Sequence, residues 1–162
     1  MSAADAGRTA VYAAEDAAFG GTDAEDERSP EELALAARAL TSGEWWCSAG
    51  APCVRVGAAR AGACSSSARS TGAPAGDVEV RVAHGQRTLA TLGHELAHAL
   101  AGVGCGHDAT FRAAHVDVTA LLLGRIPAAR LGAAYEDLGV PAGRRRWPSP
   151  VRVTGDGFAV VP

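Results

Sequence analysis

Residues 87–103 read RTLATLGHELAHALAGV and carry the clearest helical pattern in the 162-residue chain. Five apolar side chains of this stretch fall within an arc of roughly 80° when each residue advances by about 100°: Leu89, Leu92, Leu96, Leu100 and Val103. The stripe predicts an amphipathic helix whose leucines face the core. His94 and His98 lie one turn apart and away from the stripe. The helix therefore has a second face that its packing alone does not explain.

That second face carries the pattern H-E-x-x-H at residues 94–98. Imidazoles at positions i and i+4 point from one helix face toward one metal ion, and a glutamate directly after the first histidine reaches a water bound to that ion. We therefore expect His94 and His98 to bind Zn2+. Glu95 is expected to act as the catalytic general base on the zinc-bound water.

A catalytic zinc usually has three protein ligands and one open position. His107 is the preferred third ligand, because the three glycines within residues 102–106 can end the helix and turn the chain back toward the histidine pair. Four other residues remain candidates for this position: Cys105, His115, Glu136 and Asp117. The sequence also offers three candidates for stabilising an oxyanion, without choosing among them: Tyr135, Arg112 and His115.

Three further helices are expected around the motif. Residues 29–32, SPEE, have the pattern of a capping box with proline at the first helical position, and this helix should end at Gly43. A second helix is expected over residues 108–124, with Asp108 as its cap, and a third over residues 127–138.

Alternating valines predict two short strands, at residues 54–56 and 78–82. The Ser/Gly/Ala-rich stretch 62–76 between them holds either a weak strand or a loop. Trp45 and Trp46 are expected to be structural, with one of them capping a loop, because adjacent residues on one helix or strand point in different directions.

One domain is expected over residues 1–143, followed at 144–162 by a basic, proline-containing linker and a candidate terminal β-hairpin. The linker begins with Arg144, Arg145 and Arg146, which favour a solvated segment over a nucleic-acid contact.

Composition narrows the classes of protein that fit. Hydrophobic residues make up 48% of the chain, which excludes disorder throughout, and the formal net charge of −3 gives no general attraction to nucleic acid or anionic lipid. No apolar run approaches the roughly 18 to 20 residues of a membrane span. Residues 1–21 lack the pattern of a signal peptide, and we expect a cytoplasmic protein with no membrane partner. The four cysteines form no C-x-x-C pair, which disfavours a zinc ribbon.

Residues 107–111, HDATF, resemble the H-[GD]-x-x-F element that follows H-E-x-x-H in SprT-like and WLM-type zinc metallopeptidases. The chain also resembles a family of small actinobacterial metallohydrolases, through AVYAAED at residues 10–16 and HELAHAL at residues 94–100. The likeness spans about residues 9–140. The cysteine ribbon and DNA-binding region of SprT-like proteins are missing, so DNA-linked protein cleavage is not implied.

The resemblance implies an α+β, zincin-like domain in which a small, partly antiparallel sheet packs on helices. It implies His94, His98 and His107 as zinc ligands and Glu95 as catalytic base. In zincins a strand binds the substrate backbone by edge pairing, a role that residues 78–82 would have here. We therefore expect a zinc-dependent metallohydrolase acting on peptide bonds of a peptide or protein substrate. The alternative is a non-catalytic zinc-binding module for protein interaction.

Overall fold

The computed structural model describes residues 7–72 and 76–150. Within these ranges, six α-helices pack with one three-stranded sheet, which confirms the α+β class. The helices are α1 (Arg8–Phe19), α2 (Pro30–Thr41), α3 (Glu44–Ser48), α4 (Leu89–Ala101), α5 (Ala109–Leu122) and α6 (Arg125–Asp137). The strands are β1 (Val54–Ala58), β2 (Ser67–Ser70) and β3 (Val78–Val82), and two short 3-10 helices are η2 (Asp23–Glu25) and η3 (His84–Gln86).

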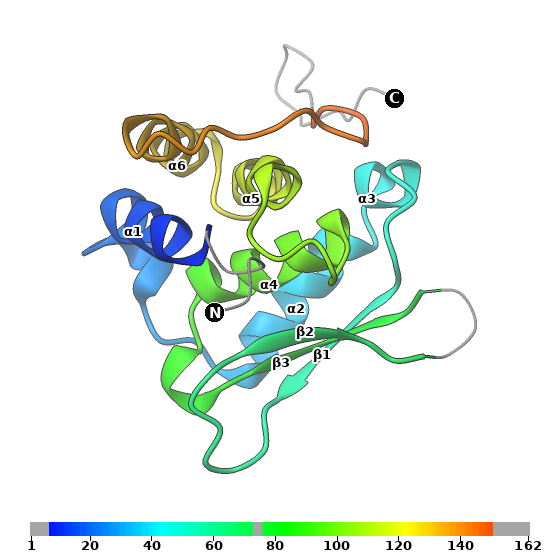
Figure 1. Ribbon diagram of the computed structural model, residues 1–162. Coiled ribbons are helices and arrows are strands. Elements are labelled where there is room, and N and C mark those ends of the chain that lie inside the picture. Colours follow the sequence, from blue (N-terminus) through cyan, green and yellow to red (C-terminus); the bar gives the residue numbers. More distant parts are fainter. Residues whose placement is uncertain (1–6, 73–75, 151–162) are drawn as a thin grey trace, which may run out of the picture.

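Helix α4 lies at the centre of the fold. Figure 1 shows the sheet below α4 and α2, with α5 on the opposite side of α4, α6 beside α5 and α1 beside α6. Eight residues of α4 are buried, including His94 and Glu95 as well as Leu92, Leu96 and Leu100. The helix that carries H-E-x-x-H therefore packs on both sides, because the sheet covers one face and α5 the other.

The sheet has the order β1-β3-β2, with β1 parallel and β2 antiparallel to β3. Residues 78–82 thus form the central strand, and the edge-pairing role expected for them is wrong, because both edges of β3 are already paired. The doubtful stretch 62–76 supplies the edge strand β2, which in the described part of the chain pairs only with β3.

Side-chain caps begin three of the helices, and two of these caps were predicted. The Ser29 capping box and the Asp108 cap are both present, and the Thr88 hydroxyl accepts a hydrogen bond from the Thr91 amide at 3.1 Å at the start of α4. Helix α4 ends at Ala101, earlier than expected, because Gly102 has a left-handed φ of +105°. Val103 lies beyond the helix and is 38% exposed, so it does not belong to the buried stripe.

Helix α1 was not predicted from the sequence, although it is part of the core. Its residues Val11, Ala14, Ala18 and Phe19 are buried. Their spacing is helical and is the signal from which this helix could have been predicted. The helix matters because it packs against the part of α4 that carries His94.

Both tryptophans are buried, which corrects the expectation that one would cap a loop. Trp45 and Trp46 are each 2% exposed on the five-residue helix α3. Their indole N–H groups donate to different partners, the carbonyl of Pro148 at 2.8 Å and the carbonyl of Pro52 at 2.9 Å. A short helix enclosed by chain on two sides can bury adjacent residues that point in different directions.

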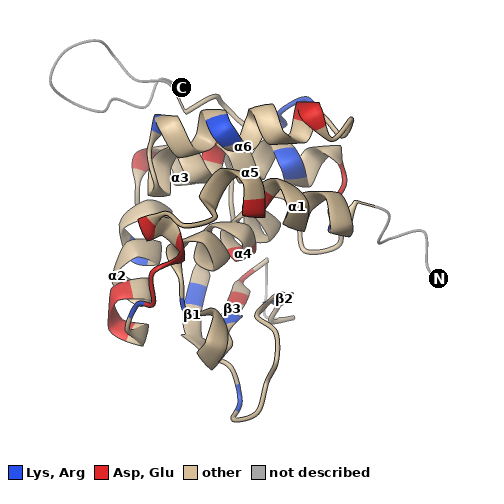
Figure 2. Cartoon of the chain, turned by 90° about the vertical axis from the view of Figure 1, so that its left-hand side faces the viewer, with Lys and Arg blue, Asp and Glu red and all other residues tan. Residues whose placement is uncertain are grey.

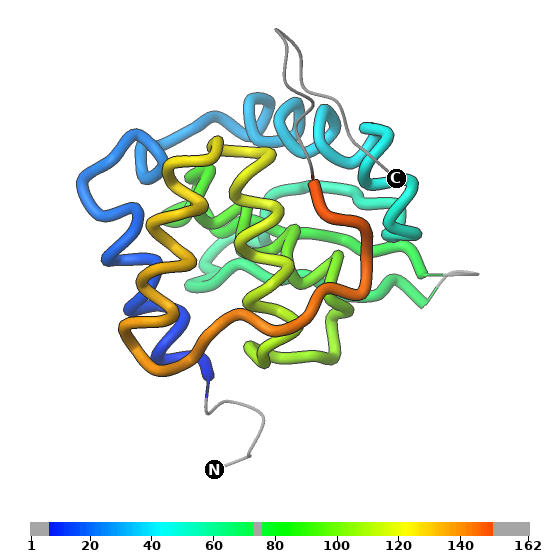
Figure 3. The backbone as a smooth tube through the Cα atoms, turned by 90° about the horizontal axis from the view of Figure 1, so that it is seen from above, coloured from blue at the N-terminus to red at the C-terminus, as the bar shows by residue number. Residues whose placement is uncertain are grey.

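The chain after α6 returns along α5 (Figure 3). Arg145 does not behave as part of the solvated linker expected, because its guanidinium bonds both oxygens of the buried Asp117 carboxylate, at 2.6 and 2.8 Å. The Trp147 indole N–H donates to the same carboxylate at 2.9 Å. The candidate terminal hairpin lies outside the described residues.

Charged side chains are mixed over the surface rather than collected by sign. Figure 2 shows acidic and basic positions interspersed along the helices, with acidic residues gathered near the start of α2. Among the described residues, no helix is long and apolar enough to cross a membrane.

Candidate metal centre

Three histidines converge where α4 ends and the next turn begins. His94 and His98 lie on α4, and His107 lies just before α5. The Nε2 atoms of His94 and His107 are 3.2 Å apart, and one ligand atom from each of the three histidines lies within 4.8 Å of the others. Two nitrogens bound to one tetrahedral zinc at 2.0–2.1 Å are separated by about 3.3 Å. The donor set and its spacing therefore fit a metal ion.

The turn between α4 and α5 delivers His107 to this point. Gly102 and Gly106 both have left-handed φ values, +105° and +57°, which reverse the chain within five residues. The thiol of Cys105 is 3.1 Å from the carbonyl of Ala101, so it is directed back at the end of α4. The Cys105 thiol is thus engaged in a hydrogen bond within the turn.

The backbone of His107 is held from two sides. The Arg112 guanidinium donates to the His107 carbonyl at 2.8 Å. On the other side, Gly7 lies so close that a Cβ at this position would overlap the same carbonyl oxygen. The start of α1 therefore packs directly on the third histidine.

The open side of the site is formed by its less buried histidines. His94 is buried, whereas His98 and His107 are half-buried. A catalytic metal needs one position that a water or substrate can reach. The partial exposure of two of the three histidines leaves room for such a position.

The electrostatic surroundings keep His98 neutral. Burial, together with the neighbouring His94 and His107, lowers the pKa of His98 to about 3. For His94 burial also lowers the pKa, but the hydrogen bond and charge of Glu15 outweigh burial, so that the pKa is raised. A neutral imidazole is the form that binds a metal, and His98 is held in it near neutral pH.

Glu95 lies next to the histidines and beside the edge of the sheet. It is 6% exposed, and burial together with the charge of Glu15 raises its pKa, against the opposing effects of His94 and of a hydrogen bond from the Ala68 backbone N–H. Ala68 lies on β2 opposite Val80 of β3. Because the N–H groups of an antiparallel edge strand point alternately toward and away from its partner, the Ala68 N–H can point away from β3 and toward Glu95. A carboxylate with a raised pKa is suited to accept and release a proton.

Glu15 is the main residue of the site that the sequence did not reveal. Its Oε1 is 2.7 Å from Nδ1 of His94 and 3.5 Å from Nε2 of His115, and the three residues form a second group that could hold a metal. The 2.7 Å separation has the length of a charge-assisted hydrogen bond and is shorter than the roughly 3.3 Å expected for two ligands of one tetrahedral ion. The group of His94, His98 and His107 therefore fits a metal ion better than the group of Glu15, His94 and His115.

The three residues considered for the oxyanion are all engaged in the structure. Tyr135 and His115 are fully buried and bonded to each other at 2.7 Å, and Arg112 donates to the carbonyls of His107 and Pro141.

The other candidates for the third ligand lie elsewhere. Asp117 is paired with Arg145, Glu136 is exposed on α6, and His115 belongs to the second group.

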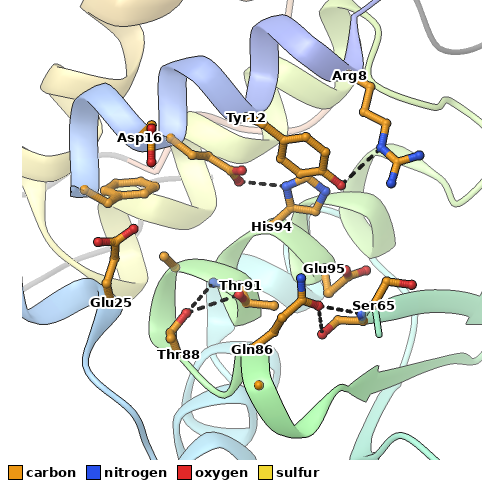
Figure 4. Close-up of a pocket in the computed structure, with 15 residues that line it drawn as sticks. Arg8, Tyr12, Asp16, Glu25, Ser65, Gln86, Thr88, Thr91, His94 and Glu95 are labelled. Atoms are coloured by element: carbon orange, nitrogen blue, oxygen red, sulfur yellow. Dashed lines mark hydrogen bonds and ion pairs between the residues drawn. The ribbon is translucent and has the colours of Figure 1, made fainter. Parts of the chain in front are cut away.

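Tyr12 is better placed for the oxyanion than these candidates. Its ring stacks on His94 with centroids 5.7 Å apart, and the side chain is 46% exposed. Its hydroxyl accepts a hydrogen bond from Nε of Arg8 at 3.3 Å. Figure 4 shows the phenol over the His94 ring, with its hydroxyl directed toward Arg8. Tyr12 belongs to residues 10–16, which carry part of the resemblance, but that pattern assigned it no role.

A cleft of about 540 Å³ opens beside the histidines, between α1 and the start of α4. Tyr12, His94 and Glu95 line it (Figure 4). Its far wall includes Ser66, whose amide and hydroxyl bond the Gln86 side-chain oxygen at 2.7 and 3.0 Å. These bonds fix the segment that leads into the edge strand β2.

Comparison of the chain with protein-family models, with curated proteins and with solved structures finds no match. The fold and the site define an α+β protein with a partly buried cluster of histidine and glutamate side chains that could bind a metal ion.

Proposed function

We propose that this protein is a zinc-dependent metallohydrolase with a zincin-like fold that cleaves peptide bonds. The proposed ligands are His94, His98 and His107, and Glu95 is the proposed general base. The observation that carries the proposal is the meeting of three imidazoles at metal-ligand spacing, one of which, His94, lines a cleft together with the buried Glu95. The resemblance of residues 107–111 to the H-[GD]-x-x-F element supports the role of His107.

Each role follows from a group in the cleft. His94, His98 and His107 would hold the zinc ion, which would lower the pKa of a bound water toward about 7 and polarise a carbonyl. Glu95 takes a proton from the attacking water at its carboxylate and passes it to the leaving nitrogen. The Tyr12 hydroxyl accepts a hydrogen bond from Arg8, and its O–H would donate to the oxygen that becomes negatively charged.

The edge of β2 provides a place for an extended substrate. Glu95 is bonded by the Ala68 N–H on the side of β2 away from β3. A peptide that added as a fourth strand along this edge would pass beside Glu95. We therefore assign the role of substrate-binding strand, which the resemblance implies for a zincin, to β2 instead of β3.

The first test is the metal content per chain of the wild type and of His107→Ala, measured by elemental analysis after purification with zinc. Cys105→Ala is the matched control, because it alters the same turn without removing a proposed ligand. We expect about one zinc per chain in the wild type and in the control, and a marked loss in His107→Ala. Full zinc content in His107→Ala would move the third ligand to another residue.

The second test separates catalysis from metal binding. Glu95→Gln should keep the zinc and the fold but reduce cleavage of a mixed peptide library by about 10²- to 10⁴-fold. If the wild type binds zinc but cleaves the library no faster than Glu95→Gln does, the non-catalytic zinc-binding module becomes the better description.

A further inference from the structure

The carboxylate of Glu15 joins His94 to a buried chain of polar groups from three other helices. Glu15 on α1 bonds Nδ1 of His94 at 2.7 Å. Nε2 of His115 on α5 faces the same carboxylate oxygen at 3.5 Å, and Nδ1 of His115 is bonded at 2.7 Å to the Tyr135 hydroxyl on α6. His115 and Tyr135 are both 0% exposed. Nothing in the H-E-x-x-H pattern requires this arrangement.

The proton positions in this chain follow from the chemistry of its members. A carboxylate only accepts hydrogen bonds, so the nitrogens that face Glu15 are best occupied by N–H groups. A neutral imidazole has one N–H, so His115 with its proton on Nε2 accepts at Nδ1 from the Tyr135 hydroxyl. His115 Nε2 has no hydrogen bond of its own among the described residues, and Glu15 is the acceptor it faces.

The same rule determines which tautomer His94 adopts. With its proton on Nδ1 toward Glu15, the lone pair of His94 lies on Nε2, which is the atom 3.2 Å from Nε2 of His107. This is the tautomer that binds a metal together with His107. Metal-bound histidines commonly donate their other N–H to a carboxylate, and the loss of that partner weakens metal binding.

We propose that Glu15 is a positioning residue of the metal centre, which holds His94 in its metal-binding tautomer and is itself held by His115 and Tyr135. The inference rests on the proposed metal centre but not on hydrolytic activity. It makes the docking of α1 and α6 a condition for tight metal binding, because each helix contributes one member of the chain.

The test is zinc affinity, measured by competition with a chelating dye, for the wild type, Glu15→Gln and Asp16→Asn. Asp16→Asn is the matched control, since it removes the same charge from an exposed neighbour on the same helix. Glu15→Gln should weaken zinc binding by about 10- to 100-fold, and Asp16→Asn by less than about 2-fold. Urea unfolding of the metal-free proteins shows whether Glu15→Gln remains folded.

A second readout needs no metal. Nitrogen-15 NMR of the imidazoles in the metal-free wild type should show the His94 proton on Nδ1, with a strongly deshielded N–H signal that Glu15→Gln loses and Asp16→Asn keeps. This signature would not move if Glu15 only packed against α4, and it can be read if Glu15→Gln proves less stable.

The outcomes are distinguishable. Equal zinc affinity in the wild type and Glu15→Gln overturns this inference alone and leaves the three-histidine centre in place. Two zinc ions per wild-type chain also overturn it, because Glu15, His94 and His115 would then form a second metal site. A wild type that binds no zinc overturns both the metal centre and the positioning role.

Discussion

Replacement of Arg145 by alanine should destabilise the protein far more than the same change at either neighbouring arginine. The Asp117 side chain is 2% exposed and accepts two hydrogen bonds from Arg145 and one from the Trp147 indole. Without Arg145, the buried carboxylate would retain only the bond from Trp147. Loss of one partner from a buried ion pair costs about 3–5 kcal/mol.

The cost here should be smaller than that range, because the Arg145 side chain is 45% exposed and water can reach part of the released carboxylate. We expect about 2–3 kcal/mol, or a fall in Tm of about 4–12 °C for a domain of this size. The assay is urea unfolding followed by tryptophan fluorescence and circular dichroism. Arg144→Ala and Arg146→Ala are the controls and should change stability by less than about 0.5 kcal/mol.

A double-mutant cycle with Asp117→Asn isolates the interaction from other effects of each substitution. A coupling free energy above about 1 kcal/mol is expected for groups in direct contact. The reasoning is refuted if Arg145→Ala lowers the free energy of unfolding no more than Arg144→Ala does. The pair of Arg145 and Asp117 would then contribute no more to stability than a solvated arginine.

Four further predictions concern the local structure and the metal. Thr88→Ala should cost about 1 kcal/mol in chemical denaturation by removing the N-cap of α4, and an unchanged midpoint would contradict the cap. Gly143→Ala should destabilise by about 1–3 kcal/mol, because a Cβ there would lie 2.8 Å from the carbonyl oxygen of Ala109; tolerance of alanine would show that this contact relaxes easily. The metal-free protein should lose stability as the pH falls from about 7 to 5, because the pKa values of His98 and His115 are lowered and the unfolded chain binds more protons at these two residues, each contributing up to about 1.4 kcal/mol per pH unit. The raised pKa values of His94 and Glu95 act in the opposite direction, but the ordinary pKa of Glu95, 4.5, lies below this window. Urea titrations with a chelator at several pH values test this, and a flat profile would argue against burial of neutral histidines. Zinc at about 1,000 times its Kd should raise the free energy of unfolding by about 4 kcal/mol, and removal by chelation should reverse the gain in thermal scans.

Residues close together in sequence were predicted well. The Ser29 capping box and the Asp108 cap each depend on groups within about four positions of one another. The face that His94 and His98 share depends in the same way on the helical repeat. Such features are visible in the sequence because the spacing of atoms within one turn of helix is fixed by the backbone.

Contacts between distant residues were missed. Glu15 lies 79 positions before His94 and belongs to the helix α1, which was not predicted. The contact between Arg145 and Asp117 spans 28 residues, and the basic run gave no sign of it. The position of β3 between β1 and β2 was equally hidden, because an alternating strand has the same pattern at an edge and at the centre of a small sheet.

The sequence by itself determined the helices α2, α4, α5 and α6, the Ser29 and Asp108 caps and the pairing of His94 and His98 on one face, because backbone geometry links residues within a turn or two. Only the tertiary structure decided which groups surround that face. The packing of α1, α5 and α6 brought Glu15, Tyr12 and His115 to the histidines, placed His107 3.2 Å from His94 and set β2 at the edge beside Glu95. These arrangements depend on how several helices and a sheet share one core, and no short stretch of sequence contains that information.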